Sequence, residues 1–335
     1  MTSEEKPSRR SRAWRVVKRS VLVGGRTGLR TAFDLLVVMI PVMVVMTTLE
    51  ALDVLPVIGR LFRPLMQLLG LPGSAALAFI SGVGVNLYSA IAVAANLTLS
   101  FKQITVLAVL CQTCHNLPVE CAVQKKAGTG VLTMIVVRLV TAVLGAWVLS
   151  LVIPGNEAWT AVATTPQPVE TLTAWEVVGT RAAANGILLV KIVGIVLGLM
   201  IVVEFLRETG LLRLLTLLVR PLTWLAGLPR QAGFTVMTSS TLGLAYGAGT
   251  VIAESRAGHL SDDEQFRTNV FIGTTHSLFE DVALFAVIGA SVLWTVVSRL
   301  VIGSLAVRTF ALLRRAVAKR AAPEPDAADA PDDSS

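Results

Sequence analysis

The sequence predicts an all-α integral membrane protein made of two inverted repeats, each with about three transmembrane helices, an interfacial helix and a re-entrant hairpin. Three observations support this prediction. First, 54% of the 335 residues are hydrophobic and 15% are charged, whereas a soluble domain carries about 25% charged residues. Second, the apolar residues form runs of the length that crosses a bilayer, about 20 residues. Third, three groups of residues recur in the same order in the two halves.

The apolar runs come first in this prediction. Six of them are predicted to cross the membrane, at residues 33–52, 74–97, 129–153, 186–206, 232–254 and 283–312. Two stretches, 55–71 and 209–228, place arginines among leucines and are predicted to be helices that lie in the membrane interface. Two further segments, 103–126 and 265–282, are apolar but are interrupted near the middle by polar residues.

These elements divide the chain into five parts. They are a basic cytoplasmic N-terminal arm (1–30), a first repeat (31–153), an external loop (154–180), a second repeat (181–312) and a disordered cytoplasmic tail (313–335) that is rich in Pro, Asp and Ala. The net charge of +7 lies largely in the arm and near the C-terminus. Flanking charge of this kind indicates cytoplasmic anchors of a bilayer protein, and not a nucleic-acid partner.

The internal repeat is the most informative feature. RPL at 63–65, TCHNL at 113–117 and RLV at 138–140 are matched by RPL at 220–222, TTHSL at 274–278 and RLV at 299–301. The first match is offset by 157 residues and the other two by 161. An insertion of four residues in the polar loop near 257–264 accounts for the difference.

Charge placement predicts how the two repeats are oriented. Residues 154–180 contain no Lys or Arg but three glutamates, so the positive-inside rule places them outside. Lys102, Lys125 and Lys126 flank the segment 103–126 and are all predicted to be cytoplasmic, which holds if this segment turns back within the membrane; a full crossing is the alternative that the sequence leaves open. With three crossings in each half, the second half is then inverted. Both termini are predicted to be cytoplasmic, in a bacterial-type inner membrane.

The polar centres of the two interrupted segments are the predicted substrate site. Their residues are His115, Asn116 and Glu120 in the first and His276, Ser277, Glu280 and Asp281 in the second. Ionisable residues at membrane depth usually have a function, and a broken helix is tolerated only inside protein or along a wet cavity. The same side chains could instead cap half-helices and lock the hairpins, and the two roles can coexist.

Four residues of the neighbouring spans complete this prediction. Arg138 and Arg299 are predicted to pair with the acidic residues or with an anionic solute; the alternative is that they snorkel to the interface. Asn86 and Tyr246 are predicted to line the site, because each can both donate and accept a hydrogen bond. The small and hydroxylated residues around them more often serve close packing of membrane helices.

Cysteine placement allows a metal site. Cys111 and Cys114, next to His115, could bind a soft metal, because thiolates suit iron(II), copper(I) or zinc. The same residues match a haem-attachment pattern, but they lie in an apolar membrane segment, and the second repeat has Ile272 and Thr275 at the matching positions. The leading interpretation is that these cysteines are ordinary small apolar residues. No cofactor is predicted.

The interrupted segments also carry a family resemblance. TCHNLPVE at 113–120, followed by KKAG at 125–128, resembles the nucleoside-recognition or Gate domain, and GTTHSLFED at 273–281 is similar to the companion motif of two-Gate members. The resemblance covers roughly residues 30–312. The family includes membrane proteins of unassigned function and sporulation membrane proteins. Related Gate segments occur in bacterial ferrous-iron transporters, whose GTP-binding domain has no counterpart here, and were likened to those of concentrative nucleoside transporters.

These observations together predict a transporter or permease. Its substrate would be a small polar solute (nucleoside-like, an organic anion or a divalent metal) bound between the two polar segments, and the His and acid pairs could couple transport to protons. The alternatives are a non-transporting membrane scaffold or partner subunit and a ferrous-iron permease-like protein. An enzyme is not expected, because an intramembrane hydrolase would need a nucleophile with a positioned base. Homo-oligomer formation is left open.

Overall fold

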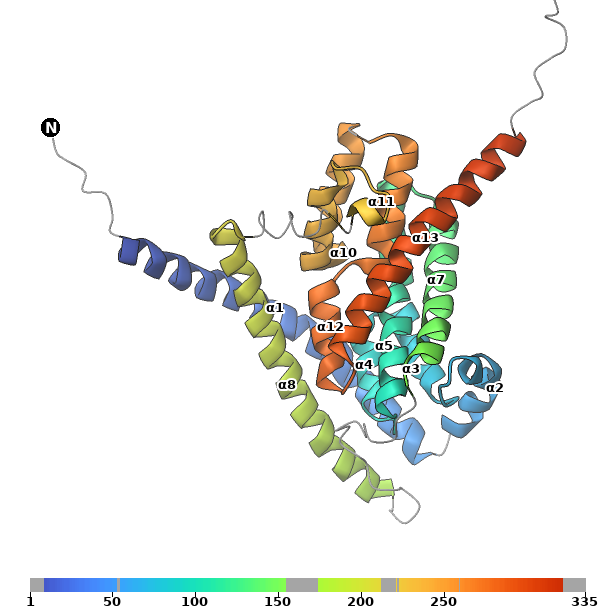
Figure 1. Ribbon diagram of the computed structural model, residues 1–335. Helices are drawn as coiled ribbons and strands as arrows, with labels where there is room; N and C mark the ends of the chain where they lie inside the picture. The colour runs from blue at the N-terminus through green and yellow to red at the C-terminus, as the bar shows by residue number, and fades with distance from the viewer. Residues whose placement is uncertain are drawn as a thin grey trace, which may run out of the picture.

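The computed structural model describes residues 9–52, 55–154, 174–211, 221, 223–258 and 260–321. These residues form helices and short connections, with no strand among them, as predicted. Five helical segments are long and apolar enough to cross a bilayer, and a bent helix pair raises the number to six. The protein is therefore an all-α, multi-pass membrane protein, and Figure 1 shows its helices gathered into one elongated bundle.

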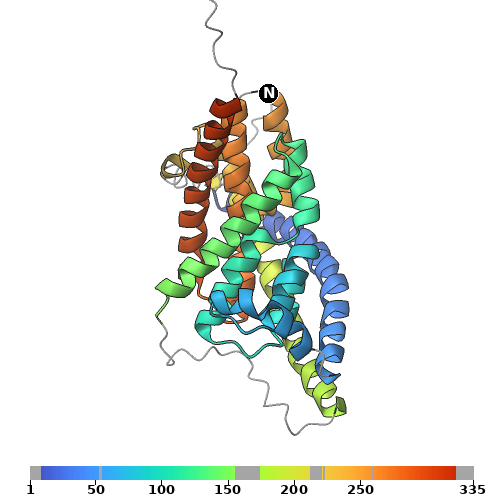
Figure 2. The ribbon, with the colours of Figure 1, turned by 90° about the vertical axis from the view of Figure 1, so that its right-hand side faces the viewer.

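The first half contains seven helices: α1 (Arg9–Ala51), α2 (Leu55–Leu68), α3 (Ala75–Gly84), α4 (Leu87–Ala94), α5 (Phe101–Cys114), α6 (Leu117–Lys126) and α7 (Val131–Val152). The described part of the second half contains α8 (Ala174–Glu208), α10 (Ala232–Ala257), α11 (Asp262–Thr275), α12 (Leu278–Val287) and α13 (Val292–Ala321). In the rotated view α13 and the end of α1 lie on opposite sides of the bundle (Figure 2).

Residues 9–30 of the predicted N-terminal arm are helical. Residues 9–30 are the first part of α1, which continues without a break to Ala51. This part packs against α8: a Cβ atom at Gly24 would lie 2.7 Å from the Cα atom of Ile201, and one at Gly28 would lie 3.1 Å from that of Leu197. Glycine thus allows the two backbones to approach closely. At the other end of the chain, α13 extends to Ala321, beyond the predicted boundary at residue 312.

The predicted crossing at 74–97 is a helical hairpin. The helices α3 and α4 have 10 and 8 residues, which gives lengths of roughly 15 and 12 Å, too short for a hydrocarbon core of about 30 Å. A Cβ atom at Gly82 would lie 3.1 Å from that of Ala90, whereas in one continuous helix these residues would be roughly 12 Å apart. The chain therefore turns back at Asn86.

The segment 103–126, predicted to turn back, instead continues across the bundle. The axes of α5 and α6 differ by 41°, whereas a re-entrant hairpin requires a near reversal. The equivalent pair α11 and α12 forms one candidate span, Asp262–Val287. The re-entrant hairpin was thus assigned to the wrong segment. Crossings in the first half are α1, α5 with α6, and α7, and their odd number still leaves the second half inverted.

The structure repeats itself at the offsets found in the sequence. Capping boxes begin α5 at Ser100 and α11 at Ser261, 161 residues later. The first half breaks at Asn86 between α3 and α4, and α10 is kinked 157 residues later at Gly243, where φ is 75° and ψ is 169°. The offset changes between Gly243 and Ser261, so the four inserted residues lie between these two positions. This range overlaps the predicted loop at 257–264.

Candidate functional site

Two helix breaks with the same backbone geometry meet in the centre of the bundle. At the first, His115 is extended (φ −72°, ψ 163°) and Asn116 is left-handed (φ 49°, ψ 39°). At the second, His276 is extended (φ −62°, ψ 167°) and Ser277 is left-handed (φ 49°, ψ 34°). Each break leaves main-chain groups at the helix ends without a partner in the helix, and each must find one inside the protein.

The hairpin α3–α4 and the helix α10 supply the hydrogen-bond acceptors for the amide groups at the two breaks. The amide of Asn116 donates to the carbonyl of Gly82 at 2.8 Å, and the amide of Ser277 donates to the carbonyl of Ser239 at 3.0 Å. Gly82 belongs to the hairpin α3–α4, and Ser239 belongs to the N-terminal part of the kinked helix α10. Each break is therefore held by the element that precedes it in its own half, and the position of the breaks is set by tertiary contacts.

Two buried arginines bind the carbonyl groups at the breaks. Arg138 on α7 donates to the carbonyl oxygens of Thr113 and His115 at 3.1 and 2.9 Å. Arg299 on α13 donates to the carbonyl oxygen of His276 at 2.7 Å, and it also donates to the main chain and side chain of Gln112 in the other half, at 3.2 Å each. Both arginines are at most 1% exposed, so neither snorkels to the interface.

Each arginine also faces an acidic residue of its own half. Nη1 of Arg138 lies 2.6 Å from Oε2 of Glu120, and Nη1 of Arg299 lies 3.4 Å from Oδ2 of Asp281. The two acids are 161 residues apart and occupy equivalent positions in α6 and α12. All four side chains are buried, and a buried charge is tolerated when it is paired in this way. Both guanidinium groups are thus held by groups of the protein, although Nε of Arg299 is buried without a hydrogen-bond partner among the described residues.

The two histidines lie against each other between the halves. Their ring centroids are 5.0 Å apart, and their Nε2 atoms are 3.4 Å apart. Both Nε2 atoms also approach Oε1 of Glu120, at 3.3 Å from His115 and 3.1 Å from His276. The predicted polar centres of the two segments are therefore brought together at one place, as a single cluster at the interface of the repeats.

A cavity of about 190 Å³ opens beside this cluster. Of the predicted site residues it is lined by Asn86, His115, Asn116, Glu120, Ser277, Glu280 and Asp281. His276 does not line the cavity and lies behind Glu120. The side chain of Tyr246 lies outside the described residues. The lining also includes residues that the sequence analysis did not select, among them Thr31, Asp34, Tyr88 and Gly243.

The polar lining joins the two halves. The hydroxyl of Tyr88 on α4 donates to the carboxylate of Glu280 on α12. Asn86 begins α4, and its side-chain oxygen accepts from the amide of Ser89 at 2.9 Å. Asp34, on α1, is exposed at the cavity. A lone carboxylate in an apolar run is a signal that could have identified Asp34 from the sequence, and Tyr88 meets the same donor-and-acceptor criterion that selected Tyr246.

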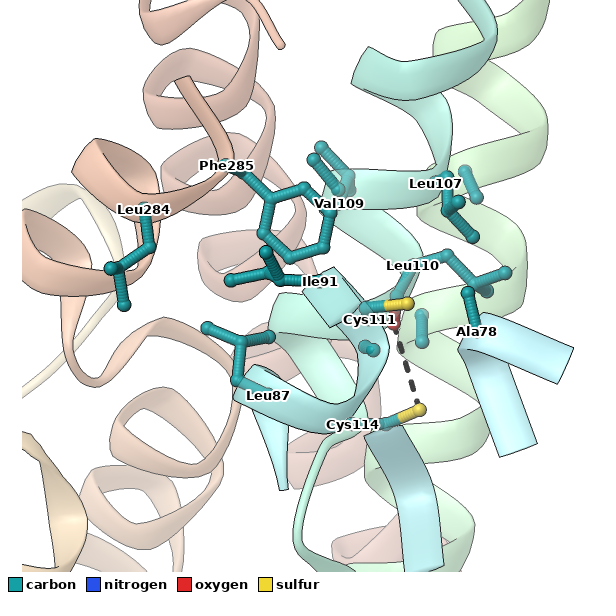
Figure 3. Packing of buried hydrophobic residues seen from close by; sticks show 14 of the residues in the cluster. Ala78, Leu87, Ile91, Leu107, Val109, Leu110, Cys111, Cys114, Leu284 and Phe285 are labelled. Carbon is teal, nitrogen blue, oxygen red and sulfur yellow. Dashed lines mark hydrogen bonds between the residues drawn. The ribbon is translucent and has the colours of Figure 1, made fainter. Parts of the chain in front are cut away.

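The proposed thiolate metal site is not assembled. Cys111 and Cys114 are buried in the apolar core beside Leu110 and Leu107 (Figure 3), and the thiol of Cys114 donates to the carbonyl of Leu110 at 3.6 Å. The three cysteines are free and buried. Among the described residues, the side chains whose ligand atoms do gather are His115, His276 and Asp281, within 4.8 Å of one another.

Comparison with known proteins agrees with these observations. The family model of the Gate domain, described as nucleoside recognition, matches residues 32–124, from α1 to α6. The uncharacterized membrane protein YvoD of Bacillus subtilis (strain 168) is 32% identical over 279 residues, which cover 82% of this chain and 89% of that protein. No solved structure matches.

Proposed function

We propose that this chain, which belongs to the Gate (nucleoside-recognition) family of membrane proteins, is a transporter or permease for a small polar solute. The observation that carries this proposal is the polar cavity where the two helix breaks meet. Secondary transporters bind their substrates at such broken helices, at the interface of inverted repeats. The cavity is smaller than the range of about 300–1,000 Å³ typical for drug-sized ligands, which supports a small substrate.

The charges of the cavity support a cationic solute or one rich in hydrogen-bond donors. Among the described residues, its lining contains four carboxylates, those of Asp34, Glu120, Glu280 and Asp281, and no arginine or lysine. The nearby guanidinium groups of Arg138 and Arg299 already bind carbonyl oxygens and carboxylates. An organic anion in this cavity would therefore face carboxylates and would find no free arginine or lysine among the described lining residues. The acidic lining favours a solute that carries a positive charge or hydrogen-bond donors.

The distribution of basic residues supports cytoplasmic termini in an inner membrane. With the N-terminus inside, the corrected topology places inside the basic residues at the ends of α6, α8 and α13, which are Lys125, Lys126, Arg207, Arg314 and Arg315. The segment 155–173, which contains no Lys or Arg, then lies outside. Lys102 moves outside, where Arg60 and Arg63 also lie. The positive-inside rule is thus followed at most of the helix ends.

The test begins with ligand stabilisation of the purified chain. Putrescine, uridine and citrate represent a cation, a nucleoside and an organic anion, and a ligand that binds the folded state raises its melting temperature. We expect putrescine to stabilise more than citrate, and Glu280→Gln to remove the effect. Glu208→Gln changes a carboxylate that pairs with Arg19 away from the cavity and should leave it unchanged. Uptake of a stabilising ligand into proteoliposomes then measures transport.

The scaffold alternative gives a different pattern in the same assays. If none of the three ligands stabilised the protein and proteoliposomes took up none of them, this substrate assignment would fail. If a ligand were taken up, but His115→Ala with His276→Ala lowered the melting temperature without changing the flux, the polar cluster would serve assembly. A transporter whose double variant folds but no longer moves solute supports the proposal.

A further inference from the structure

The three polar atoms at the centre of the cluster form a nearly equilateral triangle. Nε2 of His115 and Nε2 of His276 are 3.4 Å apart, and Oε1 of Glu120 lies 3.3 and 3.1 Å from them. These atoms come from both repeats, at the point where the two helix breaks meet. Nothing in the proposed function requires three such atoms to be so close.

Hydrogen bonding places the histidine protons on the other side of each ring. Nδ1 of His115 lies 3.2 Å from the carbonyl oxygen of Gln112, and Nδ1 of His276 lies 3.0 Å from that of Ile272. A carbonyl oxygen can only accept, so each Nδ1 carries a proton. In a neutral imidazole Nε2 then presents a lone pair, as does the carboxylate oxygen of Glu120. Three acceptors thus face one another, and a cation between them would remove their repulsion.

We propose that Nε2 of His115, Nε2 of His276 and the carboxylate of Glu120 bind one divalent transition-metal ion, with Asp281 as a fourth ligand. Bonds of about 2.0–2.2 Å to a tetrahedral ion place neighbouring ligand atoms roughly 3.3–3.5 Å apart. The three edges of the triangle are close to this value. A carboxylate oxygen of Asp281 lies within 4.8 Å of both histidine ligand atoms, so the fourth ligand requires a small movement of its side chain.

The surrounding contacts are those that orient metal ligands. Metal-binding histidines usually donate the other ring N–H to a carbonyl or carboxylate, which fixes the ring, as both rings do here. Arg138 holds Oε2 of Glu120, and the carboxylate lies against both histidines: Nε2 of His115 approaches Oε1, and Nε2 of His276 lies 3.1 Å from each of the two oxygens. Imidazole and carboxylate ligands suit zinc, iron or nickel, whereas the soft thiolates of this chain lie elsewhere.

Charge and access also fit a divalent ion. Four carboxylates line the cavity and two buried arginines lie behind it, so with neutral histidines the formal charge of this group is −2, which a divalent ion neutralises. His115, Glu120 and Asp281 all line the cavity, so an ion can reach the triangle from it. The inference concerns binding alone and holds whether the ion is transported or stays in place.

Zinc binding to the full-length protein in detergent tests this inference without any transport assay. After removal of metal with a chelator, competition with a chromogenic zinc indicator should show one tightly bound Zn²⁺ per chain. His276→Ala should lower the affinity at least tenfold, since changes to outer-shell partners alone cost about 10–100-fold. His259→Ala removes the third histidine of the sequence and serves as the matched control, with wild-type affinity expected.

A measurement on the wild type covers the case in which His276→Ala does not fold. X-ray absorption of the zinc-loaded protein counts imidazole, oxygen and sulfur ligands directly, and two imidazoles with oxygen ligands are expected. Sulfur ligands would overturn the site, and so would an affinity that falls equally in His259→Ala. Absence of stoichiometric zinc binding would overturn the site, and would leave the proposed solute transport to its own assay.

Discussion

Arg138 and Glu120 form a buried ion pair at the first helix break, with 2.6 Å between Nη1 and Oε2 and almost no exposure of either side chain. The same guanidinium binds the carbonyl oxygens of Thr113 and His115. One side chain therefore satisfies both a carboxylate and the open end of α5. The pair belongs to the architecture that holds the break, and Arg299 holds the equivalent position in the second half.

Removal of Arg138 alone should strongly destabilise the protein. Arg138→Met would leave Glu120 as an uncompensated buried charge, and breaking one partner of a buried pair costs about 3–5 kcal/mol. Thermal unfolding of the purified protein measures the loss. Adding Glu120→Gln to Arg138→Met should recover part of the stability, because the second change removes the orphan charge. Equal stability of the single and double variants would show that the carbonyl contacts of Arg138 matter more than the ion pair.

The path of α5 and α6 gives a prediction about sidedness. If the pair crosses the membrane, Lys102 and Lys126 lie on opposite sides. Single Lys102→Cys and Lys126→Cys variants, made after Cys111, Cys114 and Cys121 are replaced by alanine, should differ in labelling by an impermeant thiol reagent in intact cells. Only Lys102→Cys should label from outside. Labelling of both positions only after permeabilisation of the cells would restore the re-entrant hairpin at 103–126.

Gly243 should not tolerate a side chain. Its φ of 75° and ψ of 169° lie in a region that is essentially restricted to glycine, and an added Cβ atom would lie 2.5 Å from the Oγ atom of Ser277. Gly243→Ala should therefore cost about 1–3 kcal/mol of stability and reduce solute binding, both measured on purified protein. Gly198→Ala is the matched control, because its added Cβ atom meets no atom within 4 Å. Adding Ser277→Ala to Gly243→Ala should recover only the part of the lost stability that is due to the contact with the Oγ atom of Ser277, and not the part that is due to backbone strain.

Tyr88 and Glu280 should be coupled across the two halves. The hydroxyl of Tyr88 donates to the buried carboxylate of Glu280, and a hydrogen bond to a charged group contributes about 1.5–3 kcal/mol. Tyr88→Phe should lower the melting temperature, and the loss should be smaller when Glu280→Gln is already present. A double-mutant cycle measures this coupling. Strictly additive losses would mean that the two residues act independently.

The sequence predicted the helical class, the repeat and the polar segments of the site, but it assigned the hairpin to the wrong segment. The lysines that flank 103–126 suggested a turn, yet Pro118 lies in the first turn of α6, where a proline is compatible with a chain that continues. Asn86 has no proline beside it. The reversal of the chain at Asn86 depends on the capping of α4 by Asn86 and on the packing of Gly82 against Ala90. Neither contact can be recognised from the hydropathy of the sequence.

The site likewise combines residues that could be predicted from the sequence with contacts that could not. The histidines and acids were recognisable because ionisable residues are costly in a membrane. The contacts between halves were not, since Gln112 accepts from Arg299 across 187 residues of sequence and Tyr88 reaches Glu280 across 192. Such contacts depend on the placement of two inverted repeats against each other. The cysteines carried a recognisable pattern but point into the apolar core (Figure 3).

The zinc affinity should rise with pH. Protons compete with a metal ion for Nε2 of His115 and His276, because a histidine must be deprotonated to bind a metal ion. Each proton displaced on binding changes the affinity about tenfold per pH unit, so the affinity should increase from about pH 5.5 to pH 8 as long as one of the two rings releases a proton on binding. The charged groups that face the rings are Glu120, Glu280, Asp281, Arg138 and Arg299. Glu280→Gln, which leaves the triangle intact, should keep the steep pH dependence. A zinc affinity that did not change over this range would mean that the two rings are not the ligands.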